Sequence, residues 1–133
     1  MLDTDVLIDV ALDREPHVAA SCALLEAVER GDASGFIAWH SLSNFHYLLS
    51  LHHGAAGAKE FLLDLLNFVG VAQTSTASAA YAAGLPMKDF EDALQVAAAT
   101  ACGADVIATR NIRDYAASPV KAELPADVLR RIS

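Results

Sequence analysis

Short apolar segments alternate with longer segments of helical periodicity in this chain, and this alternation restricts the fold more than any other feature of the sequence. The apolar segments have the length of strands, while the segments between them carry apolar residues at three- and four-residue spacing. This order is typical of a parallel α/β sheet whose crossovers are helices. The predicted strands are Met1–Asp3, Phe36–Trp39, Val69–Ala72 and Val106–Thr109.

Helical segments separate and follow the predicted strands, and several of them end at glycine. Ser41 is expected as an N-cap, and Trp39, Phe61 and Phe68 are expected in the core. The elements together predict one domain over residues 1–133, with a central parallel sheet flanked by helices. The predicted helices are Asp5–Leu12, Pro16–Arg30, Ser41–Gly54, Ala56–Asn67, Ala77–Ala83, Asp89–Cys102 and Pro125–Ile132.

The composition indicates a globular protein of the cytoplasm. The chain has 133 residues, 54% of them apolar and 20% charged, which suits one folded domain. The first residues are acidic where a secretory leader would be basic, so no leader is predicted. The uncharged stretches Ala33–Ala58 and Leu65–Met87 are interrupted by polar residues, so no membrane span is predicted. Cys22 and Cys102 are expected as reduced thiols in a cytoplasmic protein.

The net charge of −8 argues against a protein that coats nucleic acid through bulk charge. It does not argue against an enzyme that acts on nucleic acid through a bound metal ion. Six of the nine basic residues fall in the last third of the chain, which allows either a local basic rim or scattered solubilising charges. These six are Lys88, Arg110, Arg113, Lys121, Arg130 and Arg131.

Three acidic segments stand where a predicted strand passes into a helix or a loop. In an open parallel sheet the carboxyl ends of the strands share one edge, and ligands bind in the crevice there. Carboxylates that reach this edge from separate strands can converge on a divalent cation, which prefers hard oxygen ligands. The three segments are Leu2–Leu7, Asp89–Leu94 and Thr109–Tyr115.

The ordered set DTDVLID at 3–9, DFEDALQ at 89–95 and TRNIRDY at 109–115 resembles the PIN-domain ribonucleases. It is most similar to the branch whose last motifs read D-F-E-D-A and T-R-N-x-R-D. The resemblance implies a three-layer α/β fold with acids at the carboxyl edge of the parallel sheet, where they bind Mg²⁺ or Mn²⁺. It also implies hydrolysis of single-stranded RNA, as in the toxins of VapC-type toxin–antitoxin pairs.

The resemblance assigns Asp3, Asp92 and Asp114 as the catalytic acids and metal ligands. Each also has a plain structural interpretation, because Asp3 can cap a helix, Asp92 can favour a helix dipole and Asp114 can sit in a turn. Asp89 is expected to cap the helix that carries Asp92. A larger set of neighbours is predicted to support the site: Thr4, Asn44, Asp89, Glu91, Thr109 and Asn111. A basic rim that meets RNA is predicted from Lys88, Arg110 and Arg113.

Two positions depart from the family pattern, because Asn44 and Asn111 stand where many relatives carry an acid. An amide oxygen can bind Mg²⁺ but brings no charge, so the metal site is expected to be weaker than usual. One alternative is therefore a degenerate PIN domain that only binds a partner. Another is a haloacid-dehalogenase-type phosphatase with Asp3 as nucleophile and Asp5 as general acid. The expected partners are an antitoxin that plugs the acidic groove and a second copy of the chain.

Overall fold

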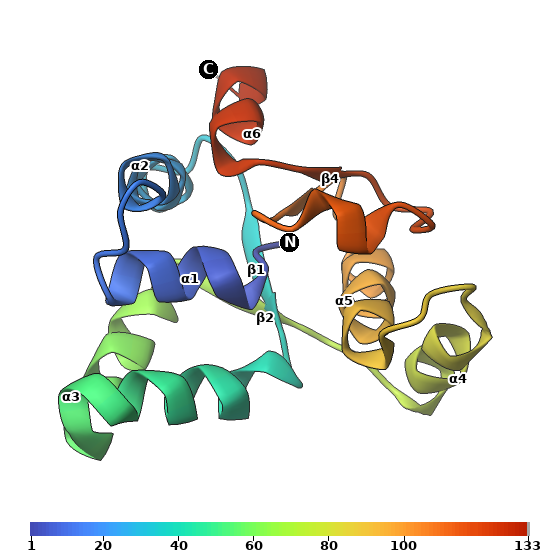
Figure 1. Cartoon of the computed structure of the whole chain (residues 1–133), viewed down its shortest axis with the longest axis horizontal. Helices are drawn as coiled ribbons and strands as arrows, with labels where there is room; N and C mark the ends of the chain where they lie inside the picture. Colours follow the sequence, from blue (N-terminus) through green and yellow to red (C-terminus); the bar gives the residue numbers. More distant parts are fainter. Residues whose placement is uncertain (133) are drawn as a thin grey trace.

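The computed structural model describes residues 1–132. Its helices are α1 (Thr4–Ala11), α2 (Val18–Glu29), α3 (Ser41–Leu65), α4 (Thr76–Gly84), α5 (Phe90–Ala101), α6 (Pro125–Ile132) and the 3-10 helix η1 (Ile112–Tyr115). Its strands are β1 (Gly35–Ala38), β2 (Val69–Ala72), β3 (Ile107–Ala108) and β4 (Ala122–Glu123). Helices α1, α2 and α3 cover one side of the strands, while α4 and α5 lie on the other (Figure 1).

Two parallel pairs of strands form the centre of the fold, and the N-terminal segment joins them. β1 pairs with β2, and β3 pairs with β4. The amide of Leu2 donates to the carbonyl of Phe36 at 2.8 Å, and Leu2 forms a parallel bridge with Ala108. The order across the molecule is therefore β2, β1, the N-terminal segment, β3 and β4. Because all pairings are parallel, the carboxyl ends gather at one edge.

The predicted α/β fold with a parallel sheet and flanking helices is confirmed, but the strands are shorter than predicted. Met1–Asp3 contributes a single bridge, and the predicted strand Val106–Thr109 narrows to β3. The prediction missed β4, since Ala122 and Glu123 do not belong to an apolar run. They form a strand because their backbone meets that of β3, which is a tertiary cause that local periodicity does not carry.

Helix α3 joins two helices that the sequence predicts as separate. Gly54 lies inside it with φ of 72°, a left-handed backbone that glycine adopts readily, so the helix bends there. The segments on either side of Gly54 are therefore the two separate helices that the sequence predicts, and the span of α3 covers both. None of the described helices is long and apolar enough to span a membrane.

Two apolar clusters fill the spaces on either side of the strands. The larger one includes Leu7, Ile37 and Phe45 and lies among α1, α3 and β1. The second lies beneath α5 and includes Val96, Ile107 and Tyr115. The prediction that Trp39 belongs to the core is wrong, because β1 ends at Ala38 and the side chain of Trp39 is 68% exposed. The other two predicted core aromatics, Phe61 and Phe68, are half-buried against the larger cluster.

Candidate metal centre

Asp3 lies where the N-terminal segment turns into α1. It is the N-cap of that helix, and its Oδ1 accepts a hydrogen bond from the amide of Thr4 at 2.8 Å. Only 8% of Asp3 is exposed. Burial raises the pKa of this carboxyl above its ordinary value, because the charged form loses hydration. The capping role is confirmed, and the role as a metal ligand remains a prediction.

Three more donors meet the carboxylate of Asp3, each from a different element. Gln95 Nε2 on α5 donates to Oδ1 at 3.0 Å. Thr109 Oγ1, just after β3, donates to Oδ2 at 2.8 Å, and the Tyr115 hydroxyl on η1 donates to the same oxygen at 3.0 Å. Burial and then the charge of Asp3 raise the pKa of Tyr115 above its ordinary value, so the hydroxyl keeps its proton. The carboxyl edge is thus organised around Asp3.

Gln95 is a site residue that the sequence analysis missed. It is fully buried, and its Nε2 also donates to Ser41 Oγ at 3.1 Å. The prediction that Ser41 caps α3 is wrong, because His40 occupies the N-cap position and Ser41 points inward with 1% exposure. A sequence signal for Gln95 did exist. It is a polar residue on the buried, alanine-rich face of α5, almost one turn after Asp92.

Asp5 lies beside Asp3 and is held by the segment after β3. Its Oδ2 accepts from the Arg110 amide at 3.1 Å, from Asn111 Nδ2 at 3.0 Å and from Thr109 Oγ1 at 3.2 Å. Burial, followed by repulsion from Asp3, raises the pKa of Asp5 to about 6. Asn111 therefore supports Asp5 as a hydrogen-bond donor. An ionised acid at position 111 could not donate this hydrogen bond.

The guanidinium of Arg110 is engaged by a buried acid. Arg110 Nε lies 2.5 Å from Asp9 Oδ2, and Asp9 is fully buried on α1. This pair ties the segment after β3 to α1. The sequence predicts Arg110 in a basic rim for RNA, but in the structure its guanidinium forms an ion pair with Asp9.

The first turn of α5 gathers three carboxylates. Asp89 is the N-cap and accepts from the Asp92 amide at 3.1 Å, which confirms the predicted capping role. Asp89, Glu91 and Asp92 each place a carboxylate oxygen within 4.8 Å of the others. Among the His, Cys, Asp and Glu side chains of residues 1–132, these three form the cluster whose ligand atoms lie this close together. Glu91 Oε1 also lies 3.3 Å from His40 Nε2. Asp3 does not belong to that group, although it was predicted to share a site with Asp92.

Asp92 carries the strongest sign of unbalanced negative charge. Burial raises the pKa of Asp92 to about 7, with further contributions from the charges of Asp89, Glu91, Asp114 and Asp3. No described lysine or arginine forms an ion pair with Asp92. The charges of Asp114 and Asp3 are among the causes that raise the pKa of Asp92, and Asp92 and Asp114 line the same surface hollow.

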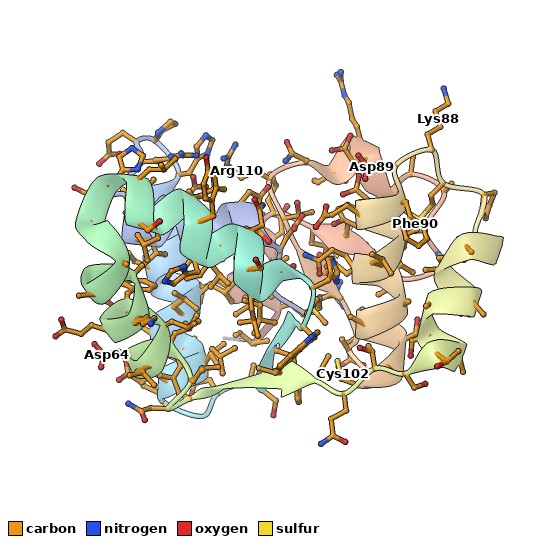
Figure 2. The ribbon with its side chains drawn as sticks, turned by 90° about the horizontal axis from the view of Figure 1, so that it is seen from below. Asp64, Lys88, Asp89, Phe90, Cys102 and Arg110 are labelled. Atoms are coloured by element: carbon orange, nitrogen blue, oxygen red, sulfur yellow. The ribbon has the colours of Figure 1, made fainter. Side chains whose placement is uncertain are left out.

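Asp114 is exposed on η1 and lines a surface hollow of about 360 Å³ together with Asp92, Lys88 and Arg113. Within residues 1–132, Lys88 and Arg113 take part in no ion pair. Figure 2 shows Asp89 at the edge of the molecule, with the side chain of Lys88 extending away from it. Asn44 is exposed on α3 and makes no side-chain hydrogen bond to a described residue.

The donor set suits a divalent cation such as Mg²⁺ or Mn²⁺. It consists of carboxylate, amide and hydroxyl oxygens, which are the hard ligands these ions prefer. Three buried oxygens near Asp3 also lack a hydrogen-bond partner among the described residues: Thr4 Oγ1, Asp5 Oδ1 and Gln95 Oε1. Buried polar atoms are normally paired, so these atoms leave capacity for water or an ion. The residues present therefore fit such a cation.

The family model described as PIN domain matches residues 1–113 of this chain. The chain therefore belongs to the PIN domain family, which has a nuclease-type fold and generally uses divalent metal ions. This membership overturns the haloacid-dehalogenase alternative. No curated protein and no solved structure matches the chain. The match ends at Arg113, so it does not extend to Asp114 or Tyr115.

Proposed function

We propose that this protein is a divalent-cation-dependent endoribonuclease that hydrolyses single-stranded RNA. In this proposal Asp3, Asp92 and Asp114 hold Mg²⁺ or Mn²⁺. The observation that carries it is the cluster of Asp89, Glu91 and Asp92, whose carboxylate oxygens lie within 4.8 Å of one another while no described lysine or arginine forms an ion pair with Asp92. A fold that gathers carboxylates without a basic partner is stabilised by a cation that binds among them.

The bound cation would lower the pKa of a water molecule and offset charge on the attacked phosphate. The protein's own groups position its ligands. Gln95, Thr109 and the amide of Thr4 fix the orientation of Asp3, while Asn111 and the Arg110 amide fix Asp5. Rigid placement of this kind aligns the reacting groups before the substrate arrives.

RNA would reach the acids from the hollow that Asp92 and Asp114 line. Lys88 and Arg113 border that hollow and are in no ion pair with described residues, so their charges are available to phosphate groups. Two basic side chains supply a local attraction that the net charge of −8 does not cancel at short range. The choice of single-stranded RNA as substrate rests on the resemblance of the three acidic motifs.

Cleavage of a labelled single-stranded RNA with Mg²⁺ or Mn²⁺ tests the proposal. We expect cleavage by the wild type, none in EDTA, and a loss of about 100-fold or more for Asp3→Asn or Asp92→Asn, since each removes a charged ligand. Asp64→Asn is the matched control, because Asp64 is an exposed acid on α3 at the opposite edge of the molecule (Figure 2). Cleavage that survives both site substitutions, or that needs no metal, would refute the proposal.

The second candidate function is a PIN domain that binds a partner without catalysis. The observation in its favour is Asn44, an exposed amide that adds no charge at a position where the family resemblance leads us to expect an acid. An active wild-type enzyme excludes this candidate. An inactive wild type that still binds RNA or a protein partner supports it.

We further propose that the protein is the toxin of a type II toxin–antitoxin pair and forms a homodimer. Support for self-association comes from the exposed apolar side chains of Tyr47 and Leu51 on α3, which are 60% and 62% exposed. Light scattering should give twice the chain mass for the wild type and the monomer mass for Leu51→Glu.

Growth arrest on expression, relieved by the protein encoded beside it, would support the toxin role. Normal growth of cells that contain the active enzyme would contradict that role.

A further inference from the structure

The carboxylate of Asp3 is saturated with hydrogen-bond donors. Oδ1 accepts from the Thr4 amide and from Gln95 Nε2, while Oδ2 accepts from Thr109 Oγ1 and from the Tyr115 hydroxyl. An ionised carboxylate offers about four lone-pair positions in total. A cation that binds to Asp3 therefore needs one of these donors to leave.

Two of the four donors are fixed by the elements that carry them. The Thr4 amide belongs to the first turn of α1, and its direction follows the helix backbone. Gln95 is fully buried on α5, and its Nε2 is shared with Ser41. Releasing either group would strand a buried polar atom, which is costly. Oδ1 of Asp3 is therefore the less available oxygen.

The two donors on Oδ2 differ in what their release would require. Thr109 is fully buried, and its Oγ1 lies 2.8 Å from Asp3 Oδ2 but 3.2 Å from Asp5 Oδ2. The single hydroxyl proton is therefore better placed to bond Asp3. Asp5 Oδ2 already accepts from the Arg110 amide and from Asn111, so it has little capacity for this proton.

Tyr115 can release Asp3 without a change in the packing of its ring. Its ring is buried in the cluster beneath α5 and anchors the residue there. The hydroxyl hydrogen turns about the C–O bond without moving that ring, so the contact can break while the packing stays. Tyr115 lies on η1, a single four-residue 3-10 turn outside the long helices.

We infer that the Tyr115 hydroxyl competes with the divalent cation for Oδ2 of Asp3. Tyr115 is then a positioning residue that holds the metal-free carboxylate in place and weakens cation binding. The inference rests on the proposed function, because it needs Asp3 to be a ligand. Tyr115→Phe keeps the ring and removes the competitor, so it should bind Mn²⁺ about tenfold more tightly, as expected for a hydrogen bond to a charged group.

Calorimetric titration with Mn²⁺ alone, without RNA, tests this inference. The variants are the wild type, Tyr115→Phe and Tyr47→Phe, in which the same atom is removed from a tyrosine that is 60% exposed on α3. We expect tighter binding for Tyr115→Phe and no change for Tyr47→Phe. Equal or weaker binding by Tyr115→Phe would overturn the inference, since a hydroxyl with a merely supporting role would help Asp3 to bind the ion.

A second measurement on the wild type does not depend on the folding of a variant. Mg²⁺ should change the near-ultraviolet absorption of tyrosine in the wild type and in Tyr47→Phe, because the Tyr115 hydroxyl loses its charged partner. A wild type that binds Mg²⁺ with no such change contradicts the inference and leaves the proposed function intact. A wild type that binds neither ion overturns both, so the two failures are distinguishable.

Discussion

Two buried or half-buried acids of this protein, Asp9 and Asp92, face opposite electrostatic surroundings. Asp9 is fully buried on α1, and Arg110 lies 2.5 Å away with its guanidinium directed at the carboxylate. Asp92 lies on α5 beside other carboxylates, in no ion pair with a described basic residue, and its pKa is raised to about 7. One acid is neutralised within the chain, whereas the other has no lysine or arginine partner among the described residues.

We propose that this difference separates a structural acid, Asp9, from a metal ligand, Asp92. A buried charge that the fold itself compensates ties two elements together, here α1 and the segment after β3. Carboxylates that gather without a basic partner lower the stability of the fold. Such groups are typical of sites where a bound ligand offsets their charge. The following predictions test whether Asp9 and Asp92 differ in this way.

The largest effect is expected at Asp9. Asp9→Ala leaves the charge of Arg110 without its partner in a mostly buried position, so the free energy of unfolding should fall by about 3 kcal/mol. Urea denaturation measures this loss. Asp32→Ala is the matched control, because it breaks the exposed Arg30–Asp32 pair and should cost less than about 1 kcal/mol. An equal loss in the free energy of unfolding for both variants would contradict the structural role of Asp9.

Addition of Mn²⁺ should stabilise the folded protein, because we expect the ion to bind to Asp92. At a free concentration 100 times the dissociation constant, one bound ion adds about 2.7 kcal/mol to the free energy of unfolding. Thermal melts with and without EDTA measure this gain, and Asp92→Asn should lose most of it. A variant that keeps the full gain would show that the ion binds elsewhere.

The metal-free protein should lose stability as the pH rises from about 4 to about 7. Asp92 has a folded-state pKa of about 7 against an ordinary value of 3.8, so in this range the folded state binds more protons than the unfolded state. Raising the pH therefore favours unfolding, and Asp5, with a pKa of about 6, acts in the same direction. Melting temperatures in EDTA should decline less steeply with pH for Asp92→Asn than for Asp64→Asn, and identical slopes would contradict the prediction.

The smallest effect is expected at the basic residues beside the hollow. Lys88→Gln and Arg113→Gln should each weaken RNA binding by about two- to fivefold at low salt and less at high salt, because each loses one phosphate contact. Fluorescence anisotropy with Ca²⁺ in place of Mg²⁺ measures binding. Mn²⁺ affinity should not change, and Lys59→Gln on α3 serves as the control. Weaker Mn²⁺ binding by Arg113→Gln would place that residue in the acidic site.

Periodicity predicted most of the fold because most elements bury a regular apolar face. β2 and α6 have the bounds that their patterns indicate, and α5 differs by one residue at each end. β4 escaped prediction since its pairing is tertiary, and Trp39 was misplaced because the strand before it ends one residue early. Local patterns do not report where a strand ends in three dimensions.

The acids that we propose for the site lie in sequence motifs, but the groups that hold Asp3 in place could not be predicted. Asp3, Asp92 and Asp114 belong to motifs that read along the chain. Gln95 and Tyr115 act on Asp3 from positions 92 and 112 residues away, so no local pattern pairs them with it. Ser41 was read as a cap because serine favours that position, whereas the fold turns it toward Gln95.

Anomalous diffraction from crystals soaked in Mn²⁺ tests the central claim most directly. We predict an anomalous peak within coordination distance of carboxylate oxygens of both Asp3 and Asp92, with that peak lost in Asp92→Asn. A peak held by Asp89 and Glu91 on the outer surface of α5, with none at Asp3, would contradict the claim.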